Sequence, residues 1–284
     1  MGKETELTLE LLNKGYDDVL KPAAQEVGEF LGSFFGILNW LVMPLTKLNI
    51  YRKAKLKKFA ENVENKLLKV PIKNRQQASI NILGPALEAL KYNFDEEELK
   101  EMFENIIVNA MDNRTSDKCH PAYVDVIRQM SNKDAILLKA LRNQTRGVRP
   151  LIMPKCQTTI NYNNQTKHGY IGDDEFPDYH IGSFEGLTTL EASKSLTSLQ
   201  RLGLLNIDKI RSVVNTIDFP GMQDPYKNLF ESAEIDEIYK SVSKQIPGTK
   251  LIQDKALFEF TEFGIDFVST CVVKNKISQT KNIP

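Results

Sequence analysis

The residues best suited to chemistry are gathered in the stretch that ends with a Cys119-His120 pair. Asp112 and Arg114 precede this pair, together with a second acid. A cysteine beside a histidine and two acids can form a metal site or an activated nucleophile. Adjacent ligands lack the spacing of a structural zinc motif, and no second Cys/His pair lies nearby. We therefore favour a helix-to-helix loop, in which Asp112 and Arg114 form capping or ion-pair contacts and His120-Pro121 begins the next helix.

A second candidate set consists of Cys156, His168 and His180, with several acids close by. Their spacing matches no compact zinc finger. The chain also lacks a phosphate-cradling glycine loop, a nucleophile elbow, an HExxH sequence and a paired cysteine motif. We predict that the protein is not an enzyme and has no catalytic residues, metal, cofactor or small-molecule substrate.

Composition indicates a folded cytoplasmic protein. Of the 284 residues, 41% are hydrophobic and 26% are charged, as in ordinary globular domains. The three cysteines (Cys119, Cys156 and Cys271) are far apart, which suits a reducing compartment better than a disulfide framework. The N-terminal residues are polar and acidic, unlike the basic start of a secretory signal.

Residues 27–45 form an apolar stretch with a single charge, Glu29. Its glycines, Gly28, Gly32 and Gly36, fall four residues apart and give a flat ridge that lets helices approach closely. Roughly 20 apolar residues cross a bilayer, and Trp40 would lie at an interface. We interpret this stretch as a membrane-acting or self-associating segment. A buried core helix of a soluble bundle is the alternative.

Two neighbouring segments have opposite charge. Residues 47–73 hold nine Lys or Arg against two Glu, whereas residues 95–104 hold six acids and one Lys. Such segregation predicts electrostatic docking, within the fold or to a partner. The basic residues could also contact anionic lipid or nucleic-acid phosphates, or simply form a solvated helix face. The residues that we expect to make such contacts are Arg52, Lys53, Lys55, Lys57 and Lys58.

The pattern from residue 51 to 145 is helical throughout. One apolar stripe joins Leu56 to Val70, a second joins Ile80 to Phe94 across a kink at Gly84-Pro85, and a third joins Leu99 to Ala110. Asp95 with Glu98, and Ser131 with Asp134, have the spacing of helix caps. Residues 146–186, broken by glycine and proline, predict an irregular connector with a short hairpin of strands near 160–162 and 169–171.

Residues 187–284 suggest a winged helix. A helix through 187–205 closes on R-L-G-L-L, and the strand 255–260 leads into T-E-F-G-I-D-F, which are two pieces found in such domains. Gly203 suits the left-handed turn that ends a helix, and the residues expected to face inward are Leu190, Leu196, Leu199 and Leu202. The connection between them is longer than a usual wing and includes a helix at 228–245. Any contacts to DNA or to a protein partner would come from Lys194, Arg201, Lys209 and Arg211.

The central stretches 86–115 and 120–131 resemble the abortive infection alpha family of bacterial proteins, and their distinctive pieces are N-F-D-E-E-E (93–98), M-D-N-R-T (111–115) and H-P-A-Y (120–123). The resemblance covers roughly residues 60–270. It implies a context, resistance to bacteriophage, and no mechanism.

The expected fold is mainly α. An N-terminal segment (1–50) and a helical domain (51–145) form a bundle, followed by the connector (146–186) and a winged-helix-like α+β unit (187–284). We predict a non-enzymatic defence protein that acts through residues 27–45 at the inner face of the cell membrane, with self-association or a protein partner. The alternative is a soluble winged-helix adaptor or a regulator that binds nucleic acid.

Overall fold

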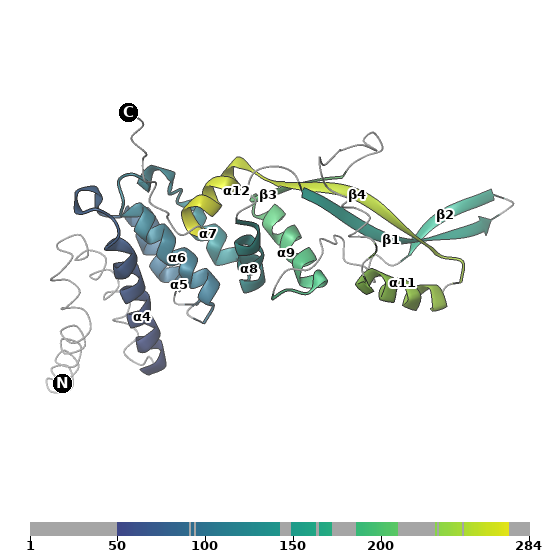
Figure 1. Ribbon diagram of the computed structural model, residues 1–284, viewed down its shortest axis with the longest axis horizontal. Helices are drawn as coiled ribbons and strands as arrows, with labels where there is room; N and C mark the ends of the chain where they lie inside the picture. The colour runs from purple at the N-terminus through teal and green to yellow at the C-terminus, as the bar shows by residue number, and fades with distance from the viewer. Residues whose placement is uncertain are drawn as a thin grey trace, which may run out of the picture. The chain divides into compact units, whose positions relative to one another are not determined.

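The computed structural model describes residues 50–90, 92–93, 95–142, 149–162, 165–171, 186–209, 231, 233–245 and 247–272 (Figure 1). The chain divides into two compact units. Unit 1 comprises residues 1–129 and 269–284, and unit 2 comprises residues 130–268. Unit 2 is thus inserted into unit 1, a division that differs from the boundaries expected after residues 50, 145 and 186. The apolar stretch 27–45 lies outside the described residues.

Unit 1 is helical over its described residues, which include one isolated antiparallel bridge between Arg75 and Asp112. Helix α6 packs against α4, α5 and α7. The elements are α4 (Ile50–Leu67), η2 (Ile72–Asn74), α5 (Ile80–Leu90), α6 (Glu97–Ala110), η3 (Ser116–Lys118) and α7 (Ala122–Gln129).

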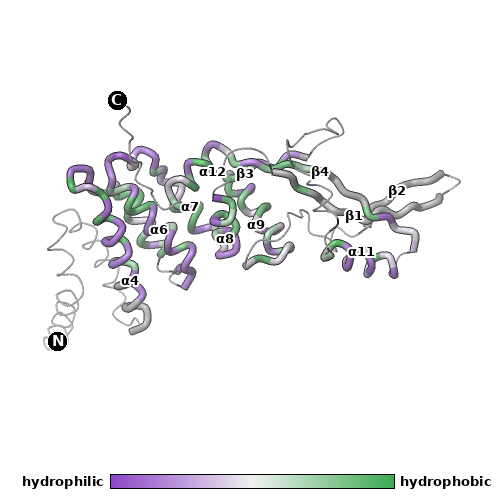
Figure 2. Tube along the Cα trace, viewed as in Figure 1, coloured by the Kyte–Doolittle hydropathy of each residue, from purple (hydrophilic) through white to green (hydrophobic). Residues whose placement is uncertain are grey.

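The predicted apolar stripes supply the core of unit 1. Phe59, Val63 and Leu67 of α4 are fully buried, and so are Phe103 and Ile106 of α6. Each such side chain contributes about 2 kcal/mol relative to exposure. Figure 2 shows how α4 mixes hydrophobic and hydrophilic positions, as expected for a helix with one face on the core.

Two predictions for unit 1 are wrong in detail. Asp95 does not cap α6, since the N-cap is Glu96 and has no side-chain capping bond; Asp95 pairs with Lys55 instead. Ile80 is not part of the core stripe, because it lies at the first position of α5 and is 62% exposed. Helix α5 continues through Pro85.

Unit 2 combines helices with a four-stranded antiparallel sheet of order β2-β1-β4-β3. Helix α9 packs against α8 and β3, and α11 packs against β1. The elements are α8 (Asn132–Leu141), β1 (Arg149–Tyr162), β2 (Gln165–Ile171), α9 (Thr189–Arg201), β3 (Leu205–Lys209), α11 (Ala233–Gln245), β4 (Lys250–Phe260) and α12 (Glu262–Phe267). The π-helix η5 (Val268–Val272) then leads the chain back into unit 1.

The register of β3 and β4 shows which face of the sheet is covered. Leu205 pairs with Phe260 and Ile207 with Phe258, and all four side chains are buried. The pair between these two, Asn206 with Glu259, points to the other face of the sheet and is exposed. This alternation is that of a sheet with one face on the core.

The region expected to be an irregular connector contains β1, the longest of the strands that the structure describes. The hairpin is present, but β1 runs from residue 149 and pairs with β4 as well as with β2. The prolines and glycines of this region argue against a strand, so the sequence did not predict it. Pro150 and Pro154 nevertheless lie within β1. Leu190 also differs from expectation, being 47% exposed. Over the residues that the structure describes, the chain is mainly helical, as predicted.

The two sequence pieces around R-L-G-L-L and T-E-F-G meet in unit 2. Gly203 has φ 75°, in the left-handed turn expected after α9. The Thr261 hydroxyl caps α12 and donates to the Gly203 carbonyl at 2.6 Å. A Cβ on Gly264 would lie 2.1 Å from the Leu204 carbonyl oxygen. Glycine therefore allows α12 to approach the end of α9 closely.

Candidate functional site

One polar cluster in the described residues joins α4 to α6. Lys66 of α4 forms an ion pair with buried Glu104 at 2.8 Å and donates to the Asn105 side-chain oxygen at 2.7 Å. Asn62, one turn earlier, donates to Glu104 at 2.8 Å. Lys55 pairs with Asp95 just before α6. We call these α4–α6 contacts the polar seam.

The same face of α6 also holds the chain where it returns from unit 2. The Asn105 amide donates to the Cys271 carbonyl and the Asn109 amide to the Thr270 carbonyl, each at 2.8 Å. The four residues are 7% exposed or less. Buried amides and carbonyls are costly without partners, so these bonds favour a single arrangement of η5 on α6.

The predicted docking of basic on acidic residues therefore takes place inside unit 1. Besides the seam, buried Lys100 pairs with Glu97 at 2.5 Å. The pKa of Glu97 is lowered by its hydrogen bond to Lys100, and the charges of Lys58 and Lys55 add to this effect. The acidic start of α6 thus experiences the positive field of α4.

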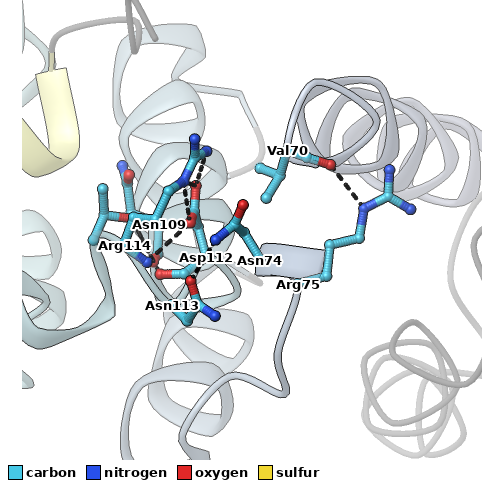
Figure 3. Close-up of polar contacts among 8 residues, drawn as sticks. Val70, Asn74, Arg75, Asn109, Asp112, Asn113 and Arg114 are labelled. Atoms are coloured by element: carbon cyan, nitrogen blue, oxygen red, sulfur yellow. Dashed lines mark hydrogen bonds and ion pairs between the residues drawn. The ribbon is translucent and has the colours of Figure 1, made fainter. Parts of the chain in front are cut away.

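Asp112 is the centre of a second polar cluster, drawn in Figure 3. Its buried carboxylate accepts hydrogen bonds from the Arg114 guanidinium, from Nε at 2.9 and 3.2 Å and from Nη2 at 2.6 Å, and one from the Arg114 backbone N–H. Burial raises the pKa of Asp112, but the hydrogen bonds and charge of Arg114 outweigh it and the pKa is lowered. The ion pair expected for a helix-to-helix loop is confirmed.

The Asp112 loop is fastened to the loop before α5. The Asn74 amide donates to the Asn113 side-chain oxygen at 2.9 Å, and the backbones of the two residues are joined by a further bond of 2.9 Å (Figure 3). The Gln76 backbone N–H donates to the Met111 carbonyl at 2.9 Å. Two connections between helices are thereby held as one rigid corner of unit 1.

The Cys119-His120 pair has the geometry of structural residues. Cys119 is buried, its thiol donates to the Thr115 carbonyl at 3.6 Å, and burial raises its pKa to about 12. Such a thiol is protonated at neutral pH and a poor nucleophile. His120 Nδ1 accepts from the Ala122 N–H at 3.1 Å, at the start of α7. Among the described residues, no cluster of three or more His, Cys, Asp or Glu is arranged to hold a metal ion.

A comparison with known protein families matches residues 51–271 to the family described as abortive infection alpha. The chain belongs to the abortive infection alpha family. The polar seam, the Asp112 loop and the sheet of unit 2 all lie within the matched residues. Family membership implies a part in abortive infection, the bacterial defence against phage. No curated protein and no solved structure matches the chain.

The described part of this family member includes some of the predicted contact residues. Lys55 is in the seam, whereas Lys58, Lys194 and Arg201 are exposed. Arg52, Lys53 and Lys57 belong to α4, and Lys209 ends β3. Cys156 is in β1 and His168 in β2, where they occupy different register positions. Gly28, Gly32, Gly36, Trp40, His180 and Arg211 lie outside the described residues. The structure describes no helix that is long and apolar enough to cross a membrane.

Sequence reasoning missed the amides of α6. Residues 102–111 are apolar except for Glu104, Asn105 and Asn109. The two asparagines are four residues apart, which puts both on one helix face. Polar residues at buried helix positions need partners. That rule could have singled out the two asparagines, but not the carbonyl groups that they bind.

Proposed function

We propose that the protein is a non-enzymatic abortive infection effector whose apolar segment, residues 27–45, acts at the inner face of the cell membrane. The helical unit restrains this segment through α4 until phage infection releases it. Unit 2, which we interpret as a winged-helix-like unit, senses infection or binds a partner protein.

The observation that carries this proposal is the polar seam. The basic helix that follows the apolar segment along the chain is attached to α6 through Lys55 and Lys66. Attachment by ion pairs is reversible, because competing charge or a shift of α6 can replace the partners. In addition, the clusters described above are built from internally paired groups, which suits a restraining role better than catalysis.

The first test is membrane fractionation of infected or overexpressing cells, with carbonate wash and detergent extraction. Wild type is expected to remain with the membrane, and a deletion of residues 23–46 to become soluble while staying folded. A soluble wild type together with an unfolded deletion variant would make residues 27–45 part of a core and overturn the proposal.

The second test concerns the glycine ridge. Gly32→Leu is expected to abolish toxicity in infected or overexpressing cells, because a bulky side chain keeps helices apart. Ala23→Leu, whose spacing of nine residues from Gly32 puts it on the opposite side of a helix from the ridge, is the matched control and should remain toxic. Toxicity of Gly32→Leu at normal expression would contradict a role for close helix packing.

A soluble regulator that binds nucleic acid is the second candidate, favoured by exposed Lys194 and Arg201 on α9. It predicts retention on heparin or DNA without detergent, weakening steeply with salt. The double change Lys194→Gln with Arg201→Gln should then abolish retention, whereas it leaves membrane fractionation unaltered under the first proposal.

A further inference from the structure

Unit 2 is joined to unit 1 at two points, between residues 129 and 130 and between residues 268 and 269. The second junction lies within η5, a π-helix. Such helices are rare and frequently occur at functional positions. Just beyond the junction, Thr270 and Cys271 are 3% and 0% exposed. The end of unit 2 is therefore followed at once by residues that are deeply embedded in unit 1.

Side chains of α6 bind the carbonyl groups of this returning segment. Helix ends leave carbonyls without partners in their own helix. Here the Thr270 and Cys271 carbonyls accept from Asn109 and Asn105, each at 2.8 Å. The two asparagines come from successive turns of α6, so they act side by side.

Asn105 belongs to the polar seam as well. Its side-chain oxygen accepts from Lys66 of α4 at 2.7 Å, while its amide nitrogen binds Cys271. The Asn109 amide also donates to the Asn105 backbone carbonyl at 3.0 Å. One planar side chain thus contacts α4 and η5 together, and a displacement on either side alters the geometry on the other.

We propose that Asn105 and Asn109 form an amide clasp that couples the exit of unit 2 to α4. When unit 2 draws η5 away from α6, the clasp opens, Asn105 reorients and Lys66 loses one of its acceptors. Buried amides without partners are unfavourable, so the clasp has a closed and an open arrangement with few stable intermediates. Only the biological consequence, release of the segment that precedes α4, rests on the proposed function.

Hydrogen exchange of the full-length protein tests the clasp. In Asn109→Ala, which removes the bond to Thr270, peptides covering 269–272 and 58–67 are both expected to exchange on the order of tenfold faster. Helices α8 and α9 of unit 2 should keep their wild-type rates. Asn74→Ala is the matched control, since it deletes an amide bond to Asn113 within unit 1. This control should leave both peptides unchanged.

Faster exchange in 269–272 with wild-type exchange in 58–67 would overturn the coupling. If Asn109→Ala fails to fold, hydrogen exchange of the wild-type protein tests the same coupling. At low urea concentrations the two segments should open with the same free energy and the same urea dependence; separate opening rejects the clasp. Hydrogen exchange needs no membrane, so the two proposals can fail separately. If the wild-type protein does not remain with the membrane but the two segments still open together, the proposed function is rejected and the clasp is retained.

Discussion

In unit 2 the Ser131 and Asp134 side chains cap α8 across three residues, and Thr188 and Glu191 do the same for α9. In unit 1, Asn62 and Glu104 meet across 42 residues, and Asn105 reaches Cys271 across 166. A local cap stabilises the start of one helix. A distant pair holds separate helices together, so its loss should affect the whole unit. The contrast predicts where a single substitution has local or wide consequences.

The largest effect is expected at the seam. Lys66→Met leaves the buried Glu104 carboxylate without its cationic partner. The free energy of unfolding should fall by about 3 kcal/mol, because an unpaired buried charge is strongly unfavourable. Urea denaturation measures the loss. A second change, Glu104→Leu, should recover most of it, and a double variant no better than Lys66→Met would show that the ion pair is not the cause.

The next largest loss of stability is expected in unit 2, where Gly264 lies close to the Leu204 backbone. Gly264→Ala would place its Cβ 2.1 Å from the Leu204 carbonyl oxygen, so α12 has to shift. We expect a loss of about 2 kcal/mol in the free energy of unfolding. Gly84→Ala is the control: its Cβ meets only Ile80 at 4.0 Å, and replacing a helical glycine should stabilise by about 0.5 kcal/mol. Equal effects at the two sites would reject the close approach.

A local cap should matter less. Ser131→Ala removes the hydroxyl that accepts from the Asp134 N–H and is expected to cost about 1 kcal/mol. Hydrogen exchange should rise mainly in the first turn of α8. Ser241→Ala, on the exposed face of α11, should have almost no effect. Faster exchange throughout unit 2 would show that its caps act as globally as the seam, and the contrast would fail.

The smallest effect concerns pH. The pKa of Asp112 is lowered from 3.8, since Arg114 outweighs burial. A lowered folded-state pKa means that the carboxylate stabilises the fold above the unfolded-state value and that this contribution fades as the pH falls through the folded-state pKa. The stability difference between wild type and Asp112→Asn should therefore be constant above about pH 5 and shrink below about pH 4. Urea midpoints from pH 3 to 7 measure it; a difference independent of pH would contradict the shift.

Sequence patterns were sufficient for the features that depend on near neighbours. The apolar stripe of α4, the Ser131 cap and the left-handed turn at Gly203 are confirmed. The Asp112–Arg114 pair is confirmed as well, since its members are two residues apart. In each of these the interacting groups lie within a few residues, so spacing along the chain is enough to bring them together.

Contacts between residues that are far apart along the chain could not be predicted from sequence spacing. Asp95 has the spacing of a cap, yet it pairs with Lys55, because packing of α6 on α4 brings a cation within reach. Asn105 and Asn109 could be recognised as buried polar positions, but only the return of η5 supplies their acceptors. Likewise β1 extends through two prolines because β4 pairs along it. These contacts form only when distant segments fold together, and the cooperative packing of the core selects among the many pairings that composition allows.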